Sequence, residues 1–177
     1  MIGVRRIGLL RWLRGLLPLL CAPMALAQAL WGPLQSGMTE DELQAALPQA
    51  VKLKRALNLP GGVRGLWHLP DTPWAGGKFD SVFYFRSGRL WEVAQALSDD
   101  QANCDLAPTF GSVLSSLQAS YGPPRTAQDA DTPGSATETD YWSHDGIDIA
   151  VLHSRAPNRC LIRVSYKPQV LLDASEL

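Results

Sequence analysis

The stretch Phe79-Asp-Ser-Val-Phe-Tyr-Phe-Arg-Ser-Gly-Arg-Leu-Trp-Glu-Val-Ala-Gln-Ala-Leu97 decides how this chain folds. Aromatic and β-branched residues alternate with polar ones on both sides of Ser87-Gly88, which is typical of two antiparallel strands joined by a tight turn. Each large apolar side chain contributes roughly 1.5–3 kcal/mol when it is fully buried. We therefore expect this hairpin to be the platform on which the core is built.

The length of the turn decides which face of the hairpin is buried. A two-residue loop at Ser87-Gly88 would put Glu92 on the same face as Phe83 and turn Trp91 away from it. A three-residue loop, with Gly88 in the left-handed conformation, would gather the large apolar side chains on one face: Phe79, Phe83, Phe85, Trp91, Val93 and Leu97. We predict the three-residue loop, because it separates the apolar residues from the polar ones.

The opposite face of this hairpin is then amphipathic. It carries Asp80, Tyr84, Arg86, Glu92 and Ala94. We predict that Tyr84, Arg86 and Glu92 form a surface for a binding partner, since an antiparallel sheet can leave one face uncovered.

The first 27 residues have the layout of a secretory signal peptide. A basic start (Arg5, Arg6, Arg11 and Arg14) precedes the apolar run 15–24, and Ala25-Leu26-Ala27 supplies a small-residue cleavage site. The alternative, an uncleaved anchor, needs about 20 apolar residues, and the arginines leave too few. We expect residues 28–177 to be exported to the periplasm or secreted, without a membrane span once the signal is removed.

Removal of the signal changes the charge of the chain. All 17 acidic residues follow Gln28, whereas four of the 16 basic residues precede it, so the mature charge is 12 − 17 = −5. A chain with this balance has no electrostatic reason to bind nucleic acid or an anionic membrane.

Two cysteines remain after cleavage, Cys104 and Cys160. In an oxidising compartment such a pair predicts a disulfide. Zinc is the alternative, but the sequence has no CxxC or HxxxH spacing to complete a site. We predict the disulfide, no metal site and no cofactor.

Two helices can be placed from their ends and their periodicity. Thr39 with Glu42 forms a capping box, and Pro48 ends this short first helix. The second helix is predicted from Pro108 to Tyr121, followed by Gly122 and two prolines. It has a single apolar stripe that should lie across the hairpin: Phe110, Val113, Leu114, Leu117 and Tyr121.

The rest of the chain reads as strands and loops. Alternation predicts a half-buried strand over 51–57, another strand over 63–69, a hairpin around Asp145-Gly146 and a last strand from Cys160 to Tyr166. We expect a loop over 70–77, where Trp74 is a candidate binding residue at the tip. Residues 126–140 are expected to be a mobile loop, and 169–177 a loose tail.

These elements predict an α+β fold in a single domain over 28–168. We expect an antiparallel sheet with the two main helices packed on one face. The order helix, strands, helix, strands also allows two halves of similar content, each with one helix and about three strands.

Short motifs resemble those of small envelope proteins. Gly37-Met38-Thr39 with Glu42-Leu43 opens a short helix, Phe85, Gly88 and Leu90 follow in the hairpin, and Tyr121-Gly122-Pro123 ends the second helix. This pattern is similar to that of the SmpA/OmlA-like outer-membrane assembly lipoproteins and the β-lactamase-inhibitor-like modules. The resemblance implies a non-catalytic protein that works through its sheet surface, and it assigns no residue a role.

The sequence contains no GxSxG, P-loop, HExxH or dinucleotide-binding motif. We therefore predict that the chain is not an enzyme and has no catalytic residues. The first hypothesis is a periplasmic binding or scaffold module for another envelope protein. The alternatives are an inhibitor or immunity-type protein that blocks a secreted enzyme, motivated by the disulfide and the loop around Trp74, and a small hydrolase.

Overall fold

The computed structural model describes residues 29–126, 130–132 and 135–169. The predicted signal peptide and residues 170–177 of the predicted tail lie outside the described residues. In chain order the elements are β1 (Ala29–Trp31), β2 (Leu34–Gln35), α1 (Glu40–Ala46), β3 (Val51–Leu59), a 3-10 turn (Pro60–Gly62), β4 (Val63–Trp74), β5 (Gly77–Arg86), β6 (Arg89–Asp99), α2 (Ala107–Tyr121), β7 (Arg125–Thr126), β8 (Ala130–Thr132), β9 (Ser135–His144), β10 (Ile147–Ala156) and β11 (Arg159–Pro168).

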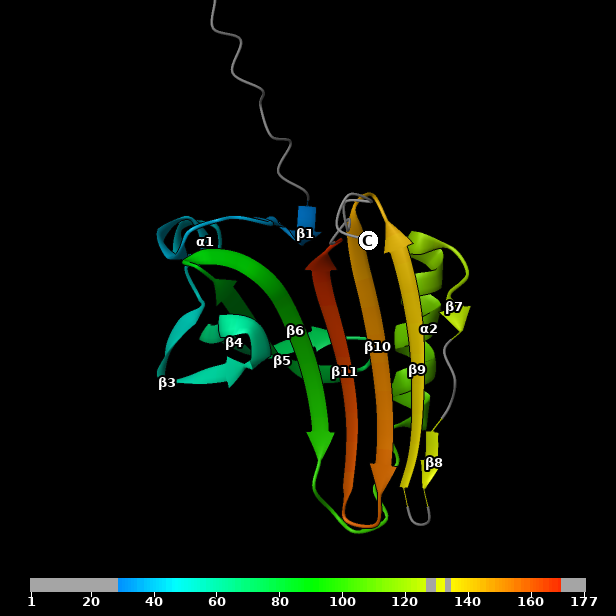
Figure 1. Cartoon of the computed structure of the whole chain (residues 1–177). Coiled ribbons are helices and arrows are strands. Elements are labelled where there is room, and N and C mark those ends of the chain that lie inside the picture. Colours follow the sequence, from blue (N-terminus) through cyan, green and yellow to red (C-terminus); the bar gives the residue numbers. More distant parts are fainter. Residues whose placement is uncertain (1–28, 127–129, 133–134, 170–177) are drawn as a thin grey trace, which may run out of the picture.

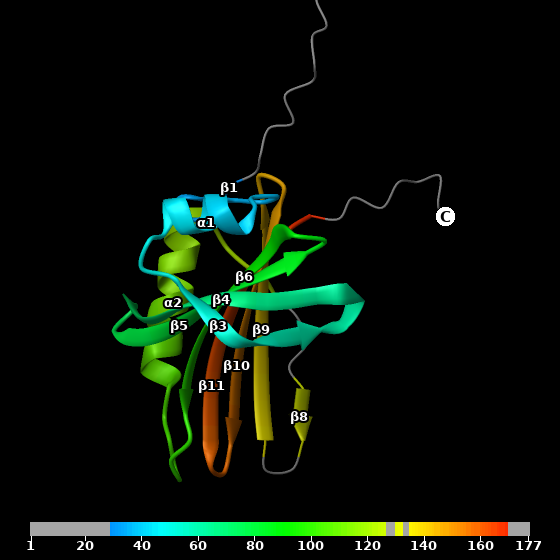
Figure 2. The same cartoon turned by 90° about the vertical axis from the view of Figure 1, so that its left-hand side faces the viewer.

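One large antiparallel sheet dominates the structure, and the predicted α+β class is confirmed. Its strand order is β3-β4-β5-β6-β11-β10-β9-β7, with β8 also paired to β9, while β1 and β2 form a separate small pair. The last strands of the two halves of the chain, β6 and β11, therefore pair with each other in the middle of the sheet. Figures 1 and 2 show that β6 curves strongly, so that β3, β4 and β5 run across the direction of β9, β10 and β11.

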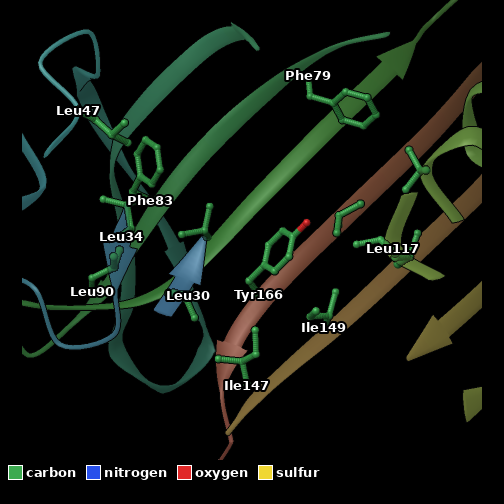
Figure 3. Close-up of a cluster of buried hydrophobic side chains, with 14 of the residues drawn as sticks. Leu30, Leu34, Leu47, Phe79, Phe83, Leu90, Leu117, Ile147, Ile149 and Tyr166 are labelled. Atoms are coloured by element: carbon green, nitrogen blue, oxygen red, sulfur yellow. The ribbon is translucent and has the colours of Figure 1, made fainter. Parts of the chain in front are cut away.

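The two helices occupy different places. Helix α2 lies along the part of the sheet made by β9, β10 and β11, whereas α1 lies beside β1 at one end of the sheet (Figures 1 and 2). Side chains of both helices nevertheless join one main core. Among its buried members are Leu43, Phe110, Val113 and Ile162. Figure 3 shows others: Leu30, Leu34, Phe79, Phe83, Leu90, Leu117, Ile149 and Tyr166.

The predicted three-residue turn of the central hairpin is wrong. Arg86 pairs with Arg89, so the loop is Ser87-Gly88 alone, and both of its residues have positive φ (51° and 75°). Such a turn is favoured because its twist matches that of the strands. A bulge follows: Phe85 pairs with Leu90, but Tyr84 pairs with Glu92, which leaves Trp91 as the extra residue.

This bulge restores most of the predicted faces of the hairpin. Phe79, Phe83, Phe85, Val93 and Leu97 all contact the main core, as expected, and Leu90 joins them. Trp91 was predicted on this face, but it packs on the opposite one. The bulge turns the side chain of Trp91 outward and allows residues on either side of it to keep their own faces.

Helix α1 begins as predicted and is fastened to the end of β6. Thr39 and Glu42 form the complete capping box, with the Thr39 N–H donating to Glu42 Oε2 at 2.8 Å. Next to the bulge, the Leu90 N–H donates to the Met38 carbonyl at 2.7 Å, and the Gly37 N–H donates to the Leu90 carbonyl at 2.9 Å. These bonds use the part of β6 that β11 does not pair with, and they set the position of the helix.

Helix α2 also agrees with its sequence signals. It ends at Gly122, which has a φ of 81°, and it buries three members of its apolar stripe, Phe110, Val113 and Leu117. The predicted disulfide joins Cys104 to Cys160 with a Cα–Cα distance of 5.9 Å. It places the start of α2 beside the start of β11, as the sequence predicts.

Four sequence predictions need correction. Residues 51–57 belong to an edge strand rather than a half-buried one, and Val51 and Leu57 are 52% and 46% exposed. The loop expected over 70–77 is largely strand, because β4 continues to Trp74 and the turn is only Ala75-Gly76. Pro70 and Asp71 sit at a register shift, where a proline does not interrupt the hydrogen bonding of the strand.

The third correction concerns the loop expected over 126–140. Strand β9 begins at Ser135 because Ala136 to Glu138 pair with the far end of β10, and β8 pairs with the same part of β9. Residues 127–129 and 133–134 lie outside the described residues. The fourth concerns the start of the predicted tail, where the Gln169 N–H donates to the Gly146 carbonyl at 2.7 Å.

Within the described residues, none of the helices has the length and apolar character needed to cross a membrane.

Candidate functional site

A small hydrophobic cluster lies on the face of the sheet opposite the main core. We call it the outer cluster. Because successive side chains of a strand point to opposite faces, Tyr84 points away from the core that Phe83 and Phe85 enter. The buried members of the outer cluster are Val63, Tyr84 and Ala94, and Leu59, Val82 and Trp91 pack against them.

Tyr84 is buried because its cross-strand neighbour is a glycine. Gly65 on β4 pairs with Tyr84 on β5, and the tyrosine ring covers it so closely that a Cβ at Gly65 would lie 2.9 Å from Tyr84 Cε1. Only 4% of Tyr84 remains exposed. From the sequence, Tyr84 was expected on an open amphipathic surface. Because its side chain is buried, Tyr84 supports this face of the sheet and offers little accessible surface to a partner.

Two cationic side chains border the outer cluster. The Arg86 guanidinium carbon lies 3.7 Å from the centre of the Trp91 ring, and the Arg86 Nε is buried with no hydrogen-bond partner in the described structure. Arg163 on β11 forms an ion pair with Glu92 at 3.1 Å and lies 5.9 Å from the centre of the Tyr84 ring. Glu92 is itself buried, so Arg163 satisfies its charge.

Trp74 lies in a different place from the other three predicted binding residues. Its indole N–H donates to Ser116 Oγ on α2 at 3.3 Å, and its ring packs 5.3 Å from that of Phe79 on the core side. Trp74 therefore folds back over α2 instead of forming an exposed loop tip. The structure brings Tyr84, Arg86 and Glu92 together on one face and places Trp74 on the other.

Trp74 lines a cavity of about 280 Å³, which we call the aromatic pocket. Its walls come from β1, the end of β4, β6, α2 and β11: Trp31, Thr72, Pro73, Trp74, Gln95, Ser116, Leu117, Ser120, Tyr121 and Tyr166. Burial raises the pKa of Tyr121 and also that of Tyr166, so both phenols stay protonated at neutral pH.

A third group of polar side chains surrounds the start of α1. Glu40 Oε2 accepts hydrogen bonds from Lys52 Nζ at 2.8 Å and from the Trp67 indole N–H at 2.9 Å. These bonds, that from Lys52 first, hold the pKa of Glu40 below its ordinary value of 4.5. Glu40 is the first residue of α1, where the helix dipole favours a negative charge, and its bonds join the helix to β3 and β4. This group therefore has a structural explanation.

A histidine on β10, His153, also has a shifted pKa. His153 stacks on Phe110 at 4.6 Å between ring centres, and its Nε2 is buried without a partner. Burial, and next the charge of Arg155, hold its pKa below 6.5. Among the described residues, no three His, Cys, Asp or Glu side chains are grouped so that they could hold a metal ion.

Sequence reasoning missed the residues that depend on the bulge and on strand order. Trp91 was assigned to the wrong face, and Arg163 was not considered because its contact with Glu92 requires β6 to pair with β11. The walls of the aromatic pocket are spread from Trp31 to Tyr166, and no local motif links them.

Comparisons of the chain with protein-family models, with curated proteins and with solved structures found no match.

Proposed function

We propose that this protein is a non-catalytic, exported binding module that docks on another protein of the bacterial envelope through the outer cluster. The side chains of α2 that pack on the sheet belong to the main core, on the opposite face from the outer cluster. The resemblance to small envelope modules points in the same direction. The disulfide is compatible with a periplasmic or secreted location.

The observation that carries the proposal is the Arg86–Trp91 pair at the edge of the outer cluster. Trp, Tyr and Arg are the residues most enriched among those that dominate binding energy at protein interfaces. The stacking holds the Arg86 guanidinium in one position, so little side-chain entropy would be lost on binding. The ion pairs seen among the described side chains do not include Arg86, and a carboxylate of the partner would supply its counter-charge.

The position of Trp74 does not favour the inhibitor hypothesis in the form that the sequence suggested. That form required an accessible aromatic loop tip, whereas the Trp74 indole is bonded to α2. We therefore place the binding surface at Arg86 and Trp91.

Site-specific photo-crosslinking in the native envelope tests this proposal. A photoreactive phenylalanine analogue replaces Trp91, and the same analogue at Ser112, an exposed position on α2, serves as the control. We expect a discrete adduct with one envelope protein from position 91 and none from position 112. The same adduct from both positions, or none from position 91, would contradict the proposal.

The purified pair then allows a matched charge reversal. Arg86→Glu should weaken binding by about thirtyfold, the effect of a residue that contributes about 2 kcal/mol. Arg159→Glu makes the same change at an exposed arginine at the start of β11, where it pairs with Asp100. This variant should leave the affinity unchanged. Equal affinity of the two variants would refute the assignment of the surface.

A further inference from the structure

The aromatic pocket lies on the opposite face of the sheet from the outer cluster. Gln95 lines the pocket, whereas its neighbour Ala94 belongs to the outer cluster, and adjacent strand residues point to opposite faces. A ligand of this pocket would thus be separate from the partner proposed above. Any function of the pocket can be tested independently of that proposal.

Gln95, at the floor of the pocket, belongs to a polar group that is buried on the core side of the sheet. Ser81 and Gln95 face each other across β5 and β6 on the core side, and they are 0% and 2% exposed. Gln95 Nε2 donates to Ser81 Oγ at 3.3 Å, and Ser81 Oγ lies 3.5 Å from Thr72 Oγ1. Burying such groups costs free energy that an apolar pair would not cost. The bond to Ser81 uses one N–H of the Gln95 amide and leaves the carbonyl oxygen to other partners.

The walls above this floor combine aromatic rings with hydroxyl groups. Trp31, Trp74, Tyr121 and Tyr166 supply the rings, and Ser116 and Ser120 on α2 supply hydroxyls. Figure 3 shows Tyr166 between the core side chains Leu30 and Leu117. Ser116 Oγ accepts the Trp74 indole N–H, so its own proton is available to a ligand. Every lining residue in the described part of the chain is uncharged at neutral pH.

We propose that the aromatic pocket binds one ring of a neutral sugar. The C–H face of a pyranose packs on an indole or phenol ring, while its hydroxyl or acetamido groups pair with an amide and with hydroxyls. A wholly apolar ligand would offer no partner to the Gln95 carbonyl oxygen or to the Ser116 hydroxyl proton, which the bonds to Ser81 and Trp74 do not use. A charged ligand would find no counter-ion. The volume of about 280 Å³ lies just below the range of about 300–1,000 Å³ for sites that hold drug-sized ligands, which suits a single ring.

The test uses the purified chain from Gln28 onward and three matched probes. N-acetylglucosamine is the neutral ring, glucosamine with its amine protonated is the same ring with a charge, and cyclohexanol is an apolar ring. Saturation-transfer NMR and calorimetry report binding, and the indole N–H resonances of Trp31 and Trp74 report its place. We expect weak but saturable binding of N-acetylglucosamine, with shifts of these two resonances, and at least about tenfold weaker binding of the other two probes.

Two variants keep the test decisive. Trp74→Leu should weaken binding of N-acetylglucosamine about tenfold by removing a stacking surface, while Trp91→Leu, the same change at the half-buried tryptophan of the other face, should have no effect. Ser120→Arg fills the mouth of the pocket from an exposed helix position and should abolish binding without unfolding the core.

Three outcomes would overturn the inference. The first is that N-acetylglucosamine fails to bind. The second is that cyclohexanol or glucosamine binds as well as N-acetylglucosamine. The third is that Ser120→Arg, shown to be folded by its thermal unfolding, retains the affinity of the wild type.

Discussion

Replacement of Gly65 by alanine should destabilise the protein, although glycine normally weakens a strand. An added Cβ would lie 2.9 Å from Tyr84 Cε1 and 3.0 Å from Val82 Cγ1, whereas carbon atoms in contact are separated by about 3.5–4.0 Å. Tyr84 is buried, so its ring must leave the position it occupies over Gly65. Overpacking of this kind lowers the free energy of unfolding by about 1–3 kcal/mol. Alanine also restricts the unfolded chain, which raises the free energy of unfolding by about 0.4–1 kcal/mol.

The expected net loss is roughly 1–2 kcal/mol in the free energy of unfolding, measured by urea titration of the oxidised chain. It corresponds to a fall of about 2–8 °C in the melting temperature for a domain of this size. Gly111→Ala is the matched control, because Gly111 lies inside α2 with open space around its Cβ position. That change should stabilise the protein by about 0.5–1 kcal/mol.

A double-mutant cycle isolates the physical cause. In a Tyr84→Ala background the ring is gone and the half-buried Val82 is free to rotate, so Gly65→Ala should become neutral or slightly stabilising. The coupling between the two positions should then be about 1–3 kcal/mol. If Gly65→Ala is as stable as the wild type, or if its cost is the same in the Tyr84→Ala background, the account of Tyr84 burial is incorrect.

Three further predictions concern the disulfide and two titrating groups. Replacing Cys104 and Cys160 by serine should cost about 4 kcal/mol, because the bond closes a long loop; denatured, unreduced protein from Gln28 onward should show no free thiol, and two thiols would disprove the bond. Glu40 has a lowered pKa, so its contribution to stability is present above pH 4.5 and is lost as the pH falls through its folded pKa. The stability difference between wild type and Glu40→Gln should therefore shrink in acid, and a constant difference would contradict the bonds to Lys52 and Trp67. His153 also has a lowered pKa, so stability should decrease as the pH falls below 6.5; an NMR titration midpoint at or above 6.5 would contradict the neutral state of this half-buried imidazole.

Features encoded within a few residues could be predicted well. The capping box at Thr39, the stripe and glycine end of α2 and the Asp145-Gly146 turn each depend on neighbouring residues, and the structure contains all of them. The loop over 70–77 was predicted from its prolines and glycines. It became strand because pairing with β5 outweighs that local signal and because a bulge accommodates Pro70.

The candidate sites were predicted less well, for a related reason. Tyr84, Arg86 and Glu92 were placed on one face by assuming a three-residue turn. The turn has two residues, and the bulge at Trp91 brings Glu92 back opposite Tyr84. Their surroundings were not predictable, since Gly65 and Arg163 reach them from strands far away in the sequence. The prolines and glycines around Trp74 are typical of a loop. Only the position of α2, to which its indole is bonded, makes Trp74 part of a pocket wall.

The sequence by itself determined the two helices, the central hairpin and the strands around Asp145-Gly146, because propensity, capping and alternation act within one turn or one strand. It also determined the pairing of the cysteines, because only two of them follow the predicted signal peptide. The tertiary structure decided the bulge at Trp91, the meeting of β6 with β11 and the two faces that could serve function. Several strand pairings are nearly equivalent for any one strand. The pairing that forms is the one that buries the most apolar surface and leaves the fewest backbone groups unpaired. That comparison involves the whole sheet at once, and no single stretch of the chain contains it.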